Sequence, residues 1–314
     1  MILSYVLKVF CQLFSQGNKK RYFFCPKTYP CYNICMERYL KIQTLAKNEI
    51  NRVNNELVQK LNLSEPLLSQ MRSFLSAPAK RIRPILTILY IKACEHTLTE
   101  NHYKLLTAIE LVHNASLIHD DVIDDADLRR NKKTLNTEFN PKLAVVAGDY
   151  LLSCALEYIQ EINIPQILIN FTNTLSEMCN GEFSQYFAAN KIPSMNEYLI
   201  KTEQKTAKLF MTALECSMIL SNLPPENARE FAYNFGMTFQ IKDDLTNILT
   251  TKTDIENGIF TAPIILSGQI NTPAIEKTYD LLNNYINNAI KNLNKLNENK
   301  YQKALLELME IYRR

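Results

Sequence analysis

Apolar side chains recur along most of this chain at the spacing that places them on one face of an α-helix. One segment, 105–118, is apolar on nearly all sides, which is typical of a helix buried at the centre of a domain. Glycines are few, at 6. The pattern therefore predicts an all-α protein, with helices over 39–61, 67–75, 85–91, 105–118, 143–159, 165–187, 195–222, 228–249 and 301–312.

Composition limits what such a helical protein can do. The chain has 314 residues, of which 46% are hydrophobic, so it can bury a large core. Lys and Arg number 35 against 32 Asp and Glu, a net charge of +3 that argues against nucleic acid as the main partner. No uninterrupted apolar stretch reaches about 18 residues, so we expect no transmembrane segment.

The first 36 residues differ from the rest of the chain because they carry basic but no acidic side chains. We therefore expect two parts, an N-terminal extension over 1–36 and a helical domain over 37–314. A targeting segment, a membrane-surface anchor and a disordered tail are all compatible with the extension. The basic residues of this extension are Lys8, Lys19, Lys20, Arg21 and Lys27.

The predicted central helix runs directly into a cluster of aspartates. Asp120, Asp121 and Asp124 share one helical face, where like charges are unfavourable unless a positive group lies among them. Oxygen ligands at this density favour Mg²⁺, which commonly shares its coordination with substrate phosphates. A solvent-exposed charge run is the alternative, whereas an EF-hand loop would require a Gly and a Glu that are absent.

A second pair of aspartates, Asp243 and Asp244, ends another strongly apolar helix, with Asn247 where a third carboxylate would complete the copy. Two such clusters at the ends of buried helices are hard to explain as surface charge. Basic residues also precede a proline-started helix at Lys80, Arg81 and Arg83, an arrangement suited to anions.

Taken together, these motifs resemble those of the all-trans polyprenyl diphosphate synthases, from about residue 37 to the C-terminus. The family's fold implies one isoprenoid-synthase-type helical bundle around a central cavity, usually as a homodimer. Within the family, the sequence looks most like the cyanobacterial and plastid solanesyl-type members. The motifs are Lys80-Arg81-Ile82-Arg83-Pro84, Asp120–Asp124 with Arg129-Arg130, Gly148-Asp149, Gly181-Glu182 with Gln185, Lys205-Thr206-Ala207 and Phe239-Gln240 before Asp243-Asp244.

The resemblance also implies roles for individual residues. Mg²⁺, as three ions with bound diphosphate, would be held by Asp120, Asp121, Asp124 and Asp243, and Arg129 and Lys205 would complete the catalytic set. The allylic diphosphate would contact Arg129, Lys205, Thr206, Gln240 and Lys252. Isopentenyl diphosphate would contact Lys80, Arg83, His113 and Arg130. A lone His on an apolar helix is more often a core residue, but the position of His113 two turns before Asp120 matches the family's pattern.

The implied activity is a Mg²⁺-dependent prenyltransferase that condenses isopentenyl diphosphate head-to-tail onto an allylic primer. Product length would be set by Val112, Ala115 and Ser116, since side chains one and two turns before Asp120 point under the growing chain. Ala115 and Ser116 are small, which favours a long-chain product over farnesyl or geranylgeranyl diphosphate. A plastid and a bacterial-type cytoplasmic location both fit, as does a peripheral membrane contact for the product.

Several departures from the family pattern surround the predicted site. Asn247 replaces the usual third Asp of the second motif, and the segment that follows it is shorter than usual. These departures keep open a second hypothesis, in which the chain is a non-catalytic regulatory subunit that needs a partner synthase. A class I terpene cyclase is disfavoured because it has no use for an isopentenyl diphosphate site. The other departures are Ala79 and Asn131 in place of glycine and Lys133 in place of proline.

Overall fold

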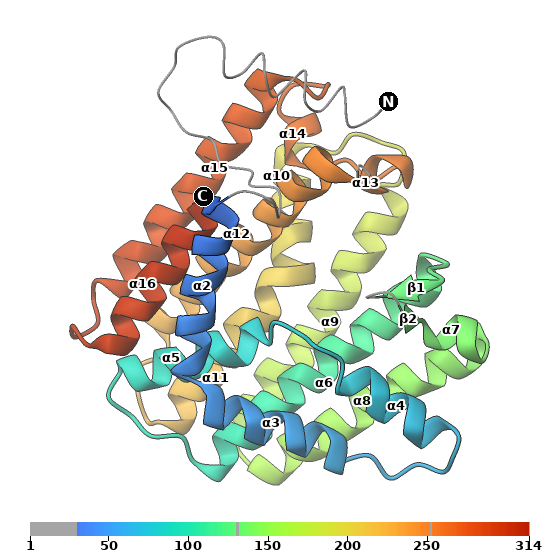
Figure 1. Ribbon diagram of the computed structural model, residues 1–314, viewed down its shortest axis with the longest axis vertical. Helices are drawn as coiled ribbons and strands as arrows, with labels where there is room; N and C mark the ends of the chain where they lie inside the picture. The colour runs from blue at the N-terminus through green and yellow to red at the C-terminus, as the bar shows by residue number, and fades with distance from the viewer. Residues whose placement is uncertain (1–29, 130–131, 252, 314) are drawn as a thin grey trace.

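The computed structural model is a bundle of α-helices in which residues 30–129, 132–251 and 253–313 are described (Figure 1). The predicted all-α class is confirmed, since the strands in these ranges are the two-residue β1 (Leu128–Arg129) and β2 (Lys132–Lys133), paired antiparallel. The helices are α2 (Pro30–Thr44), α3 (Lys47–Gln59), α4 (Leu67–Leu75), α5 (Ile82–Ala93), α6 (Glu100–Ile123), α7 (Leu135–Glu138), α8 (Pro141–Ile162), α9 (Pro165–Phe187), α10 (Met195–Thr202), the π-helical η1 (Glu203–Ala207), α11 (Lys208–Leu220), α12 (Glu226–Thr250), α13 (Thr253–Glu256), α14 (Ala262–Ile265), α15 (Thr272–Leu293) and α16 (Lys300–Arg313).

Two helix boundaries near the N-terminus differ from the sequence prediction. The helix expected over 39–61 is two helices, α2 and α3, because the backbone leaves helical geometry at Ala46, which has φ −119° and ψ 9°. Apolar spacing continues across this bend, so periodicity alone could not reveal it. In addition, α2 begins at Pro30, ahead of the predicted boundary at residue 37. The remainder of the predicted extension, 1–29, lies outside the described residues.

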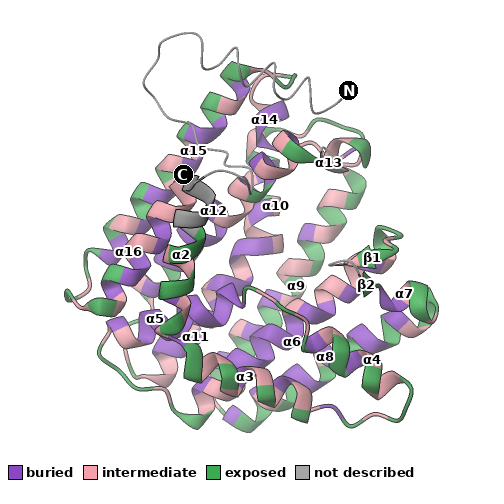
Figure 2. Cartoon of the chain, in the orientation of Figure 1, coloured by how far each residue is buried: buried purple, intermediate pink, exposed green. Residues whose placement is uncertain are grey.

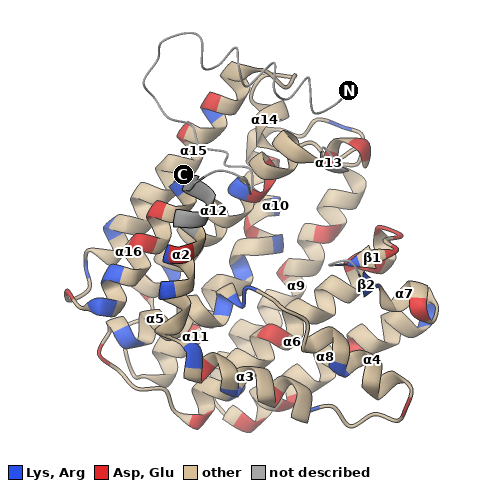
Figure 3. Cartoon of the chain, in the orientation of Figure 1, with Lys and Arg blue, Asp and Glu red and all other residues tan. Residues whose placement is uncertain are grey.

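Helix α6 is the centre of the bundle, and it packs against α3, α5, α8 and α11. Its buried side chains lie on nearly all sides, as the sequence predicts, and Figure 2 shows buried positions concentrated on α6 and its neighbours. Charged positions of both signs are scattered over the outer helices in Figure 3. The buried apolar residues of α6 are Leu105, Leu106, Ala108, Ile109, Leu111, Val112, Ala115 and Ile118.

Local capping signals explain where several of these helices begin. Asn140 precedes α8, with Pro141 at the first helical position, and its side chain accepts a hydrogen bond from the Leu143 amide at 2.9 Å. Ser194 and Glu197 form a reciprocal capping box at the start of α10. These side chains satisfy backbone N–H groups that a helix start leaves without internal partners.

By length and composition, α8 is the one helix in the described part of the chain that could cross a membrane. The sequence analysis expected no such segment. In the fold, α8 packs along the length of α6 with Ala144, Ala147, Leu151 and Ala155 among its buried residues. A core helix of a helical bundle meets the same length and composition criteria, so this helix is weak evidence for a membrane span.

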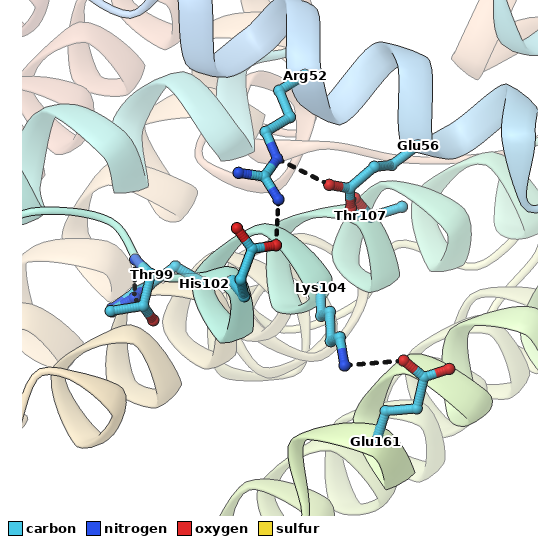
Figure 4. Close-up of polar contacts among 8 residues, drawn as sticks. Arg52, Glu56, Thr99, His102, Lys104, Thr107 and Glu161 are labelled. Atoms are coloured by element: carbon cyan, nitrogen blue, oxygen red, sulfur yellow. Dashed lines mark hydrogen bonds and ion pairs between the residues drawn. The ribbon is translucent and has the colours of Figure 1, made fainter.

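Polar contacts fix the N-terminal half of α6 against its neighbours (Figure 4). Arg52 of α3 donates to Glu56 at 3.0 Å and also contacts Glu100 at the start of α6. The hydroxyl of Thr107 donates to Glu56 at 3.2 Å. On the other side, Lys104 and Glu161 form an ion pair of 2.9 Å between α6 and α8. These links hold the register of the helix that carries the first aspartate cluster.

His102 closes the first turn of α6 and gives the fold a predicted sensitivity to acid. Its Nδ1 accepts from the Thr99 amide at 3.1 Å, and its Nε2 lies 3.2 Å from the Ser217 carbonyl oxygen. Burial lowers the pKa of His102 below its ordinary value. Because the unfolded chain then binds the proton more readily, the stability that neutral His102 contributes is lost as pH falls below about 6.5.

We therefore expect His102→Gln to reduce the loss of thermal stability between about pH 7.5 and pH 5.5. Glutamine at this position can still accept the Thr99 amide hydrogen bond, but it does not titrate. Thermal melts at both pH values measure the effect. Thr97 is exposed, so Thr97→Ala is the control and should retain the wild-type pH dependence. An unchanged pH dependence in His102→Gln would contradict the assignment.

Candidate active site

The first aspartate cluster lies at the C-terminal end of α6, with Asp120 and Asp121 in the last turn and Asp124 at the cap. Asp121 is buried, with 3% exposure. Arg129 of β1 donates to both of its carboxylate oxygens, with Nε at 2.8 and 2.9 Å and Nη2 at 2.7 Å from Oδ1. The short hairpin thus supplies the positive charge that this buried carboxylate requires.

Among the described residues, Asp120 and Asp124 have no such close cationic partner. Burial raises the pKa of Asp120 to about 6, and it also raises the pKa of Asp124. The positive charge of Lys205 opposes both shifts, whereas the nearby carboxylate of Glu182 reinforces them. Lys205 itself forms an ion pair with Glu182, at 2.5 Å. The two carboxylates at the end of α6 are therefore well placed to receive additional positive charge.

Glu182 is a residue of this site whose role the sequence analysis did not assign. It stood only in the Gly181-Glu182 motif of the helix over 165–187, with no role of its own. The tertiary structure pairs it with Lys205, which lies on a different helix. A polar residue on an otherwise apolar helical face was the available signal, but its partner depends on how α9 packs against η1.

The second cluster lies near the C-terminal end of α12, and its two aspartates have different surroundings. Asp243 is exposed, whereas Asp244 is buried with 3% exposure. Asp244 accepts hydrogen bonds from the Tyr198 hydroxyl at 2.6 Å and from the Gln240 amide at 2.8 Å. Burial raises the pKa of Asp244 to about 6, and these hydrogen bonds limit the rise. Asp244 thus supports the end of α12, while Asp243 stays accessible.

A hydrogen-bonded chain connects this support to the Lys205 segment. Thr206 donates to the side-chain oxygen of Gln240 at 2.8 Å, and Gln240 donates in turn to Asp244. Three residues predicted to contact diphosphate, Lys205, Thr206 and Gln240, are therefore brought together. Tyr198 is the last residue in this series of hydrogen bonds. It was not identified from the sequence because its partner, Asp244, lies 46 residues away.

Lys205 and Thr206 lie on η1, a π-helical turn between α10 and α11. Turns of this kind are frequent at functional sites, because the extra residue displaces side chains from the regular helical face. Two glycines leave space for η1. A Cβ added at Gly181 would lie 3.0 Å from the Lys205 backbone nitrogen, and one at Gly236 would lie 2.5 Å from the Ala207 Cα. The sequence predicted a regular helix here.

The basic residues at the start of α5 have different surroundings. Arg81 is buried and donates to Glu110 at 2.8 Å and to Asn54 at 2.9 Å. Arg83 is also buried, its guanidinium lies 4.6 Å from the Phe210 ring centre, and its Nε has no hydrogen-bond partner. Burial lowers the pKa of Arg83 to about 10. Lys80 is exposed, and its charge acts on Asp243.

Other predicted residues lie on or near α6. Val112 and Ala115 are buried, and the partly buried Ser116 donates to the His113 carbonyl at 2.9 Å. Arg130 and Lys252 lie outside the described residues, as does Asn131.

The Gly148-Asp149 motif packs against the end of α6. A Cβ at Gly148 would lie 2.2 Å from Nε2 of His119, and His119 lies 3.3 Å from the Asp149 carboxylate. The glycine therefore allows α8 to approach the residue that directly precedes Asp120.

A pocket of about 760 Å³ opens between α2, α3 and the loop before α5. Lys80 and Arg81 line one side, and Asn51 and Asn54 line another. Neither aspartate cluster lines this pocket. The central cavity that the resemblance implies is thus a different space, and it stays a prediction.

The donor chemistry of the site fits Mg²⁺ held jointly with phosphate. Among the residues that the structure describes, no three His, Cys, Asp or Glu side chains gather closely enough to hold a metal by themselves. Mg²⁺ in phosphate-binding sites commonly takes one or two carboxylates from the protein and the remaining oxygens from substrate and water. Asp120, Asp124 and Asp243 can supply those carboxylates, and the unpaired Nε of Arg83 can donate to a phosphate oxygen.

One protein family matches most of the length of this chain. The profile of the Polyprenyl synthetase family matches residues 64–302. Decaprenyl-diphosphate synthase of Dictyostelium discoideum is 32% identical over 79% of this chain and 62% of its own length. Component 2 of the heptaprenyl diphosphate synthase of Bacillus subtilis is 32% identical over 80% of this chain and 72% of its own length.

Plastid relatives and solved structures agree with this match. Chloroplastic solanesyl diphosphate synthase 1 of Arabidopsis thaliana is 30% identical over 71% of this chain. The chain spans 62% of the Dictyostelium relative and 59% of the Arabidopsis relative. The crystal structure of heptaprenyl diphosphate synthase from Staphylococcus aureus has a TM-score of 0.80 and 25% identity, and it covers 85% of this chain and 98% of that protein. The predicted isoprenoid-synthase fold is confirmed.

The close contact between Gly236 and η1 yields a stability prediction. Gly236→Ala should lower the free energy of unfolding by about 1–3 kcal/mol, because the new methyl group meets the backbone at Ala207 and one helix must shift. Urea denaturation measures the change. Asn288→Ala, at an exposed position of α15, is the control and should stay within about 0.5 kcal/mol of wild type. Wild-type stability in Gly236→Ala would contradict this account of the packing.

Proposed function

Because the chain belongs to the Polyprenyl synthetase family, we propose that it is a prenyltransferase that makes a long-chain all-trans polyprenyl diphosphate. It would add isopentenyl diphosphate head-to-tail to an allylic diphosphate primer. The observation that carries the proposal is that Lys205 acts on Asp120 and Asp124 of α6, while its neighbour Thr206 is hydrogen-bonded to the Gln240–Asp244 chain of α12. The ends of α6 and α12, which carry the two aspartate clusters, are thus linked through the segment that contains Lys205 and Thr206.

Each group of residues has a role in this proposal. Asp120, Asp124 and Asp243 would hold Mg²⁺, and Asp121 would orient Arg129 through their ion pair. Bound Mg²⁺ would supply positive charge that stabilises the departing diphosphate. Lys205, Thr206, Gln240 and Arg129 would bind the same diphosphate through donors that the fold already positions.

The second substrate would bind beside the first. Arg83 has a buried guanidinium with an unpaired Nε, and Lys80 lies close enough to Asp243 to influence its pKa. These cations would hold the diphosphate of isopentenyl diphosphate so that its double bond faces the allylic carbon. Loss of the allylic diphosphate, attack by the double bond and loss of one proton complete a five-carbon extension. The departing diphosphate is a suitable proton acceptor, so no side-chain nucleophile is required.

The names of the relatives support the long-chain assignment. They include decaprenyl, solanesyl and heptaprenyl diphosphate synthases. Chloroplast and bacterial proteins are both among them, so plastid and cytoplasmic locations stay open. A homodimer also stays a prediction, and large exposed apolar side chains on α8 and α9 support it. They include Val145, Val146, Leu156, Leu168 and Ile169.

One relative favours a second candidate function. The Bacillus subtilis protein is named as component 2 of its synthase. By analogy, this chain could require a partner chain for activity, as the regulatory-subunit hypothesis states. The arrangement of Lys205, Thr206, Gln240 and the aspartates favours the self-sufficient enzyme, since a subunit relieved of catalysis could lose any of them.

The first test is an assay of the purified chain with Mg²⁺, labelled isopentenyl diphosphate and farnesyl or geranylgeranyl diphosphate. We expect products longer than four isoprene units after dephosphorylation and reverse-phase chromatography. Asp120→Asn should lower kcat at least about 100-fold, the scale on which one preorganised electrostatic group acts. Thr172→Ala, at an exposed position of α9, is the control and should retain activity. No incorporation by folded wild-type protein would favour the partner-dependent subunit.

Product length tests the role of Ala115. Ala115→Phe should shorten the longest product, because an aromatic ring would occupy space under the growing chain at a fully buried position. Ala115→Ser, which changes the side-chain volume little, is the matched control and should give the wild-type product distribution. Chromatography of the dephosphorylated products measures both variants. An unchanged product length in Ala115→Phe would refute the assignment.

A further inference from the structure

Asn247 occupies the position where the family pattern has a third aspartate. It lies four residues after Asp243, so both side chains project from the same face of α12. The connection that follows is short, since α12 ends at Thr250 and α13 begins at Thr253. This short connection brings the next acidic residue, Asp254, back toward the end of α12.

Asn247 and Asp254 form a reciprocal pair of hydrogen bonds. The Asn247 side-chain amide donates to the Asp254 carboxylate at 3.1 Å. The Asn247 side-chain oxygen accepts from the Asp254 backbone amide at 3.3 Å. Only a side chain with both a donor and an acceptor can make this pair. A carboxylate at position 247 could accept from the backbone amide, but it would repel the Asp254 carboxylate.

The segment after Asp254 is held at its other end as well. The Ile259 amide donates to the Asp254 carbonyl at 2.7 Å, which closes a turn. The Asn190 amide donates to the Gly258 carbonyl at 2.9 Å and so ties this turn to the loop before α10. Gly258 has φ of +70°, a conformation that favours glycine. The Asn247–Asp254 contact and the Asn190–Gly258 contact thus attach this segment at its two ends.

The position of Asp254 relates it to both aspartate clusters. Burial raises the pKa of Asp254, and the negative charges of Asp243 and Asp124 act on it in the same direction. The positive charges of Lys201 and Lys205 oppose the rise. The Asp254 carboxylate contacts Asn247, four residues after Asp243 on α12, so it lies beside the second cluster and within electrostatic reach of Asp124 and of the lysines of α10 and η1.

We propose that Asn247 is a positioning residue that holds the Asp254 carboxylate in the active site. The carboxylate missing from α12 is then supplied from α13, and the amide at position 247 fixes its orientation. This inference rests on the proposed prenyltransferase function. It explains why the departure at position 247 is compatible with an active enzyme, because the pair of residues still carries one carboxylate and one amide.

Exchanging the two side chains tests the proposal. Asn247→Asp places two carboxylates in contact, and Asp254→Asn removes the only carboxylate of the pair. We expect each single variant to lower kcat/KM for the allylic diphosphate about 10-fold or more. Losses of this size are typical when a residue that orients a metal ligand is replaced. The double variant N247D/D254N keeps the hydrogen bond and the net charge, so it should recover most of the loss. Losses that simply add in the double variant would overturn the proposal.

Hydrogen exchange provides a readout that does not depend on activity. Loss of the Asn247 contact should speed exchange of the backbone amides of residues 254–259 about 2- to 10-fold, the equivalent of one net hydrogen bond. Asn247→Ala and Asn247→Asp should show this, and N247D/D254N should restore wild-type exchange. Thr250→Ala, at an exposed position of the same helix, is the control and should not change exchange in this segment.

The two measurements separate the hypotheses. An inactive wild-type chain whose exchange responds as expected would count against the proposed function and leave the Asn247 contact supported. An active wild-type chain with unchanged exchange and unchanged kcat/KM in Asn247→Asp would overturn the positioning role alone.

Discussion

Carboxylates at the ends of buried helices are the constraint on which the rest of this structure depends. A charge that loses water must gain partners, and the two clusters gain them to different degrees. Asp121 is paired with Arg129, and Asp244 is hydrogen-bonded by Tyr198 and Gln240. Within the described part of the chain Asp120 has no comparable partner, and burial raises its pKa. The structure thus fixes the supporting carboxylates and leaves others able to accept a cation.

Close helix packing determines where the cationic side chains can act. The charge of Lys205 acts on the carboxylates of α6 from a π-helical turn, and that turn fits because Gly181 and Gly236 carry no side chain. Any larger residue at these glycines would separate η1 from α9 or α12. The site therefore depends on interior packing far from the charged atoms, since the lysine position follows from the distance between helix backbones.

Neighbouring residues in a charged motif can have separate functions. Arg81 and Arg83 are two positions apart, yet Arg81 joins α5 to α3 and α6, and Arg83 keeps a guanidinium nitrogen unpaired. Asn247 is a similar case, because its amide contacts Asp254 and takes no carboxylate role of its own. The role of each of these side chains therefore depends on the residue that it contacts in the folded protein.

The sequence by itself determined the helical class, the buried central helix and the positions of the aspartates, because helical periodicity and local charge are properties of neighbouring residues. The tertiary structure decided that 39–61 bends at Ala46, that 203–207 forms a π-helical turn, and that α8 packs along α6. It also decided that Arg129 pairs with Asp121 and that Glu182 pairs with Lys205. Glu182 and Lys205 meet because α9 packs against η1, and Arg129 meets Asp121 because the β1–β2 hairpin lies against the end of α6. The spacing of these residues along the chain shows neither contact.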